Sequence, residues 1–126
     1  MIFIVDDDIA MAENCSMFLE GNGFEVTVAA SGADALAHID GATAELVISD
    51  CAMPGMSGTD LSASLRANPA TAGCPILLMS ASLRCDVAQG SDYDAFLRKP
   101  FMAEKLLAEV QALLDAAREN KKYLKV

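Results

Sequence analysis

The chain has few basic residues and no long apolar run. Its 126 residues include nine lysines and arginines against 18 aspartates and glutamates, which gives a net charge of −9. Proteins bind nucleic-acid backbones with clustered Lys and Arg, so we expect no direct nucleic-acid binding by this chain. No apolar stretch approaches the roughly 20 residues that a membrane-spanning helix needs, so we expect no membrane association. Because the N-terminus starts with a strand-like run and has neither a basic region nor a small-residue cleavage site, we expect no signal peptide and a cytoplasmic protein.

Histidine and paired cysteines, which are common zinc ligands, are also scarce. His38 is the only histidine, and the four cysteines form no C-x-x-C pair; they are Cys15, Cys51, Cys74 and Cys85. A zinc site would therefore lack ligands. In a cytoplasmic protein we expect the cysteines to be free thiols.

What the chain has instead is 53% hydrophobic residues, arranged in alternating strand-like and helix-like segments. Short apolar runs predict strands, and longer stretches with apolar residues at helical spacing predict helices. The expected strands are residues 2–5, 24–29, 46–50, 76–80 and 95–98, and the expected helices are residues 9–20, 32–39, 58–67 and 102–118. This alternation predicts a parallel sheet with helices on both faces, in a doubly wound α/β fold.

Two parts of the chain fit this scheme less well. Residues 83–94 should hold a fourth helix, but Gly90, Ser91 and Asp92 interrupt any apolar periodicity, so we expect that helix to be short or distorted. Residues 120–126 are basic and are expected to form a frayed tail. No linker or repeat divides the chain, which predicts one domain over residues 1–126.

Polar side chains stand at the carboxyl ends of four of the expected strands. Asp6 and Asp7 follow the first strand, and Asp50 ends the third. Ser80 ends the fourth strand, and Lys99 follows the fifth. In open parallel sheets, ligands bind in the crevice at this edge. Acids, a hydroxyl and a cation would meet there, and this combination can hold a divalent metal and a phosphoryl group.

Each of these residues also has a purely structural interpretation. An acidic run is usually a solvated face or a helix start, and Asp8 fits this interpretation as the N-cap of the first helix. Ser80 alone would more often be a capping hydroxyl at a strand end, and Lys99 alone would be a surface charge. Ser57 is expected to cap the helix at residues 58–67. It is the joint placement at neighbouring strand ends that favours a functional site.

Four stretches match a known family in order and in strand context: IVDDD at 4–8, ISDCAMPGMSG at 48–58, LMSA at 78–81 and LRKPF at 97–101. With these stretches, the sequence resembles the receiver domains of two-component response regulators, including the chemotaxis regulators. The resemblance covers almost the whole chain, and four stretches in register are more specific than any one. It implies a flavodoxin-like fold, with a five-stranded sheet of order 2-1-3-4-5 and five helices.

The resemblance also implies a role for each residue at the strand ends. Asp50 would be the phosphoacceptor and Lys99 its partner, which would contact a phosphoryl oxygen after the reaction. Ser80 would hydrogen-bond another phosphoryl oxygen. Ser80 and Phe96 would form a switch, because Ser80 would move toward the phosphoryl group and Phe96 would swing into the vacated space.

Mg²⁺ is the implied cofactor, with Mn²⁺ as a substitute. Asp7 and Asp50 would bind the metal directly, Asp6 would act through water, and the backbone carbonyl of Ala52 would complete the protein ligands. Magnesium favours such oxygen ligands in octahedral geometry.

The function implied is that of a phosphoacceptor domain in two-component signal transduction or a phosphorelay. A histidine kinase or a histidine phosphotransfer protein would donate the phosphoryl group, and a downstream protein or an output domain would respond to the changed surface. Such a domain catalyses its own phosphorylation and dephosphorylation but is not a turnover enzyme.

Three alternatives remain at this point. A degenerate receiver would bind a partner without phosphorylation. The presence of all five key residues argues against this alternative, whereas the short fourth helix is compatible with it. An aspartate-nucleophile phosphohydrolase would have D-x-D after the first strand with the second acid as general acid, and no acid stands at Ala52 for turnover. A flavin-binding domain would need a Ser/Thr/Gly-rich phosphate loop after the first strand, which the sequence lacks.

Overall fold

The computed structural model describes residues 1–39, 43–81 and 92–124, with only the backbone of 120–124. Five parallel strands form one sheet in the order β2-β1-β3-β4-β5. The strands are β1 (Ile2–Val5), β2 (Val26–Ala29), β3 (Leu46–Asp50), β4 (Ile76–Ser80) and β5 (Ala95–Arg98). The flavodoxin-like strand order expected from the sequence is therefore confirmed.

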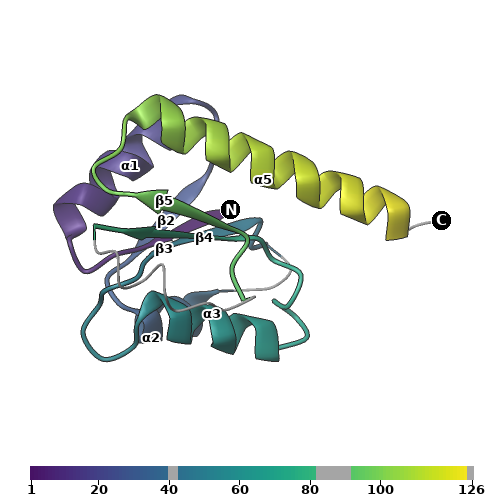
Figure 1. Cartoon of the computed structure of the whole chain (residues 1–126), viewed down its shortest axis with the longest axis horizontal. Helices are drawn as coiled ribbons and strands as arrows, with labels where there is room; N and C mark the ends of the chain where they lie inside the picture. Colours follow the sequence, from purple (N-terminus) through teal and green to yellow (C-terminus); the bar gives the residue numbers. More distant parts are fainter. Residues whose placement is uncertain (40–42, 82–91, 125–126) are drawn as a thin grey trace.

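Helices cover both faces of the sheet, as Figure 1 shows. One face carries α1 (Ile9–Gly21) and α5 (Ala103–Leu124), and the other carries α2 (Gly32–His38) and α3 (Gly58–Ala67). The short or distorted helix expected at residues 83–94 lies largely outside the described residues. Across the described ranges, no helix has both the length and the hydropathy of a bilayer span.

The sheet separates two apolar cores, because successive side chains of a strand point to opposite faces. The core under α1 and α5 includes Ile4, Leu19, Ile48, Met79, Leu97, Leu106 and Val110. The core under α2 and α3 includes Phe3, Val5, Val47, Leu61, Leu65 and Leu78. Burial on both faces explains why the central strands are nearly continuous apolar runs.

Two predicted boundaries were wrong by more than one residue. Helix α5 was expected to end near residue 118, but its backbone remains helical to Leu124. No glycine or proline follows Arg118, so nothing in the local sequence stops the helix. Strand β2 begins at Val26 rather than at residue 24, because the Phe24 N–H donates to the carbonyl of Leu19 in α1 at 3.2 Å.

Three helices begin with a side-chain cap. Asp8 Oδ1 accepts a hydrogen bond from the Met11 N–H at 3.2 Å. Ser31 caps α2, and Ser57 caps α3 in a reciprocal pair with Asp60. These side chains satisfy N–H groups that have no partner inside the helix. The expected N-cap roles of Asp8 and Ser57 are confirmed.

Arg66, near the end of α3, joins three segments. Its guanidinium donates hydrogen bonds to the carbonyls of Ala72 and Cys74 and to Asp94 Oδ2, the last at 2.6 Å. Asp94 Oδ2 also accepts the Ile76 N–H at 2.8 Å. One side chain therefore ties α3 and the loop after it to the starts of β4 and β5.

Replacing Arg66 should destabilise the fold. We expect Arg66→Ala to lower the free energy of unfolding by about 2 kcal/mol, because two partly buried carbonyls lose a charged donor. Arg118 is the matched control, since its contact with Asp115 is an exposed pair at 3.8 Å; Arg118→Ala should change stability by less than about 0.5 kcal/mol. Urea unfolding measures both values, and equal losses would contradict the joining role of Arg66.

Candidate functional site

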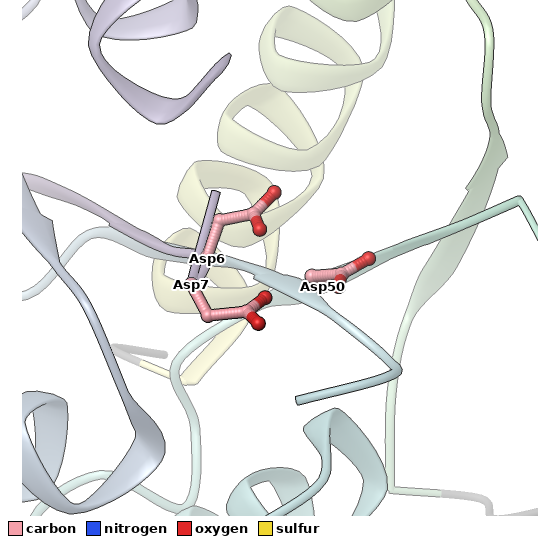
Figure 2. Close-up of side chains that lie close together, drawn as sticks. All are labelled: Asp6, Asp7 and Asp50. Atoms are coloured by element: carbon pink, nitrogen blue, oxygen red, sulfur yellow. The ribbon is translucent and has the colours of Figure 1, made fainter. Parts of the chain in front are cut away.

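The carboxyl ends of β1, β3 and β5 bring three acids and one lysine together. Asp6 and Asp7 follow β1, Asp50 ends β3, and Lys99 follows β5. Carboxylate oxygens of the three aspartates lie within 4.8 Å of one another, and Figure 2 shows the three side chains grouped at the strand ends. The sheet order accounts for this grouping, because β3 pairs directly with β1 and parallel strands end at one edge.

Lys99 supplies the positive charge of this cluster. Its ammonium nitrogen lies 3.0 Å from Asp50 Oδ1 and 3.1 Å from Asp6 Oδ2. The main-chain N–H of Lys99 donates to the carbonyl of Ser80 at 2.9 Å, which holds the end of β5 against the end of β4. Lys99 therefore bridges the two buried carboxylates, whereas Asp7 is exposed.

Burial and charge act in opposite directions on this bridge. Burial raises the pKa of Asp50; Lys99 opposes the rise, and the charges of Asp6 and Asp7 add to it. Burial alone would lower the pKa of Lys99, but the hydrogen bonds and charges of Asp50 and Asp6 together outweigh burial and raise it. Lys99 therefore remains charged at neutral pH, and the Asp50 carboxyl is harder to ionise than an exposed aspartate.

The chemistry of the three acids fits a hard divalent cation. They offer only oxygen ligands, which Mg²⁺ and Mn²⁺ prefer, and one lysine leaves part of their negative charge unbalanced. Asp6 Oδ1 accepts the Asp8 N–H at 2.9 Å, and Asp6 Oδ2 accepts a hydrogen bond from Lys99. Both Asp6 oxygens thus have protein partners, which suits a water-mediated role. Ala52 is exposed, and the metal contact expected of its carbonyl stays a prediction.

The two residues expected to form the switch lie on neighbouring strands. Ser80 ends β4 and is only 1% exposed. Phe96 in β5 is half-buried and packs against the core on the α2 and α3 face. The structure places Ser80 at the same sheet edge as the acid cluster, and the movement expected of both residues stays a prediction.

A groove of about 520 Å³ opens beside Lys99, between α1 and the start of α5. Its walls are mostly apolar and include Met11, Cys15, Phe18, Phe101 and Leu106.

Burial, followed by the charge of Asp6, raises the pKa of the Cys15 thiol, so this thiol is protonated at neutral pH. Among the described residues, no disulfide joins Cys15, Cys51 and Cys74.

Gly58 has a structural role at the site that its sequence position does not reveal. A Cβ atom on Gly58 would lie 2.4 Å from the main-chain oxygen of Asp50 and 3.0 Å from Cys51 Cα. The Gly58 N–H donates to the Cys51 carbonyl at 2.9 Å. The first turn of α3 therefore rests directly on the backbone of Asp50. In the sequence, Gly58 is simply a residue after a helix cap, and only the packing shows why it has no side chain.

Comparison with known proteins assigns the family. Residues 2–111 match the family model described as the response regulator receiver domain. The chain belongs to the response regulator receiver domain family. The resemblance seen in the four sequence stretches is thereby confirmed.

Relatives of the receiver domain agree with this assignment. The chain is 35% identical over 116 residues to the sensory transduction protein RegX3 of Mycobacterium tuberculosis (strain ATCC 25618 / H37Rv). This alignment covers 90% of this chain and 50% of that protein. The chain spans about half the length of the curated relatives it matches.

Solved structures share the fold. A CheY-like receiver domain protein from Methanospirillum hungatei JF-1 has a TM-score of 0.85 at 30% identity, over 94% of this chain and 96% of that chain. The response regulator protein TrrA from Thermotoga maritima, in complex with Mg²⁺-BeF, has a TM-score of 0.81 at 28% identity, over 89% and 96% of the two chains.

A methyl group at Gly58 should disturb the Asp50 backbone. We expect Gly58→Ala to lower the free energy of unfolding by about 1–3 kcal/mol, because a close-packed site must move to admit it. Gly73→Ala is the matched control, since nothing lies within 4 Å of its Cβ position; it should be neutral or stabilise the receiver domain by up to about 1 kcal/mol. Chemical denaturation measures the free energy of unfolding of both variants. An unchanged value for Gly58→Ala would contradict this prediction, because it would show that α3 moves away from Asp50 at little cost.

Asp50→Asn should stabilise the metal-free receiver domain at neutral pH. Because the native pKa of Asp50 is raised, the native state binds this proton more readily than the unfolded chain does. The contribution of Asp50 to the free energy of unfolding therefore falls as the pH rises from about 3.9, the ordinary aspartate pKa, through the native pKa. Asparagine removes this loss, so the advantage of the variant should shrink toward pH ~4. Urea unfolding at both pH values tests this, and equal stability at neutral pH would contradict the raised pKa.

Proposed function

We propose that the receiver domain accepts a phosphoryl group on Asp50 from a phosphohistidine donor, with a divalent cation held by Asp6, Asp7 and Asp50. The observation that supports this most directly is the grouping of three carboxylates within 4.8 Å, with Lys99 bridging two of them. Phosphoryl transfer depends mainly on positioning and on neutralising charge, and this cluster has the groups for both.

In the proposed reaction, one Asp50 oxygen forms a bond to phosphorus while the P–N bond to the donor histidine breaks. The imidazole of the donor leaves with the electron pair of that bond, and an aspartyl phosphate remains on Asp50. A bound Mg²⁺, or Mn²⁺ in its place, would neutralise charge on the phosphoryl oxygens. The carbonyl of Ala52 is the proposed additional ligand of that cation.

Lys99 and Ser80 are the other residues to which we assign a direct role. Lys99 already lies 3.0 Å from Asp50 Oδ1, so its ammonium is close to where a phosphoryl oxygen would stand. Ser80 would donate its hydroxyl hydrogen to a second phosphoryl oxygen. Phosphorylation adds roughly −1.5 to −2 of charge, and the coupled movement of Ser80 and Phe96 would carry this change to the surface near β5.

The proposed donor is a histidine kinase or a histidine phosphotransfer protein, and the proposed recipient of the signal is a downstream protein or an output domain. The apolar groove beside Lys99 supports a donor surface next to the acceptor, because exposed apolar patches often mark protein contacts. We further propose that residues 1–126 act as one cytoplasmic receiver domain, which modifies itself and does not turn over a separate substrate.

Intact mass after incubation with acetyl phosphate and Mg²⁺ tests the proposal. The wild-type receiver domain should gain one phosphoryl group, and the gain should disappear in Asp50→Asn and when EDTA removes the metal. Asp115→Asn is the matched control, because Asp115 is an exposed aspartate on α5, and it should gain the group normally. A folded wild type that binds Mg²⁺ but gains no phosphoryl group would instead favour a degenerate receiver that binds partners without phosphorylation.

A further inference from the structure

Asp8 connects the acid cluster to α1 through its side chain, its main-chain N–H and its main-chain carbonyl, which accepts the Ala12 N–H at 3.0 Å. Its side-chain Oδ1 accepts the Met11 N–H at 3.2 Å and so caps the helix. Its main-chain N–H donates to Asp6 Oδ1 at 2.9 Å. The cap fixes the backbone at residue 8, and that backbone in turn holds one oxygen of Asp6.

The orientation of Asp6 depends on few groups. The residue is only 1% exposed, so little solvent can reach its carboxylate. Asp8 holds Oδ1, and Lys99 contacts Oδ2 at 3.1 Å. Lys99 also contacts Asp50, whereas the hydrogen bond that the Asp8 amide donates within the described structure goes to Asp6. A displacement of the Asp8 amide would therefore let the Asp6 carboxylate rotate.

We propose that Asp8 is a positioning residue: by capping α1 it fixes the amide that orients Asp6 for the cation site. This inference rests on the metal site of the proposed function. Among the described residues, the oxygens close enough to share one cation come from Asp6, Asp7 and Asp50, and the Asp8 oxygen bound to Met11 is part of the helix cap. Asp8 acts through its cap and its amide, and its charge is secondary.

Two substitutions separate the cap of Asp8 from its charge. Asp8→Ser keeps a good N-cap and removes the charge, whereas Asp8→Glu keeps the charge and replaces a preferred cap with a poor one. Mn²⁺ binding to the unphosphorylated chain, followed by electron paramagnetic resonance, provides a readout that needs no phosphodonor. We expect Asp8→Ser to bind Mn²⁺ close to wild type, and Asp8→Glu and Asp8→Ala to bind about fivefold more weakly.

Ser31→Ala is the control for general loss of stability. Ser31 caps α2 by accepting the Asp34 N–H at 3.0 Å, and neither residue contacts Asp6 through a described hydrogen bond or ion pair. This variant and Asp8→Ala should both lose stability, but Ser31→Ala should keep its Mn²⁺ affinity. Urea unfolding of all variants gives the stabilities for this comparison.

The amide resonance of residue 8 in metal-free protein supplies a second, geometric readout. The chemical shift that marks this amide as hydrogen-bonded should persist in Asp8→Ser and be lost in Asp8→Glu. If Asp8→Glu bound Mn²⁺ as tightly as wild type and Asp8→Ser bound it weakly, the inference would be overturned. Asp8 would then act on the cation through its negative charge. Equal affinity in all Asp8 variants would also overturn it. A wild type that binds Mn²⁺ but accepts no phosphoryl group would overturn the phosphoacceptor proposal alone.

Discussion

The contact of one ammonium group with two buried carboxylates is the interaction on which the site depends. Lys99 lies within 3.1 Å of both Asp6 and Asp50, and among the described residues it is the cation in contact with these two acids. Like charges at short range disfavour ionisation, so the lysine allows the acids to be adjacent in the absence of metal. The remaining negative charge is the feature that suits the cluster to a divalent cation.

The sheet supplies the rigidity that this arrangement needs. Asp6 and Asp50 extend from β1 and β3, two of the three inner strands, and both strands are buried. Lys99 follows the edge strand β5, and its main-chain N–H donates to the Ser80 carbonyl at the end of β4. Side chains on well-packed strands are placed more accurately than side chains on loops. The same topology that creates the crevice therefore fixes the distances inside it.

Much of this could be predicted from the sequence because each signal is local. Short apolar runs marked the strands, side-chain caps marked the helix starts at Asp8 and Ser57, and the positions of Asp6, Asp7 and Asp50 after parallel strands brought them to one edge. These predictions need only periodicity and the geometry of an open sheet. The family resemblance then supplied the strand order, which alternation alone leaves open.

What the sequence did not reveal depends on contacts between distant segments. The link from Arg66 to Asp94 spans 28 positions, and no local pattern marks either residue. The end of α5 was misplaced because a polar helix end and a polar tail have similar compositions. The lack of room at Gly58 is equally invisible, since it depends on where the Asp50 carbonyl lies relative to α3.

That lack of room has a mechanical consequence. Helix α3 begins against the peptide group of Asp50, with no space between them for even one methyl group. A helix moves largely as a unit, since hydrogen bonds link its successive turns. A backbone shift of Asp50 toward α3 would therefore meet no free volume to absorb it, and the whole helix would have to move. Strand β3 and α3 thus behave as one stiff body at their point of contact.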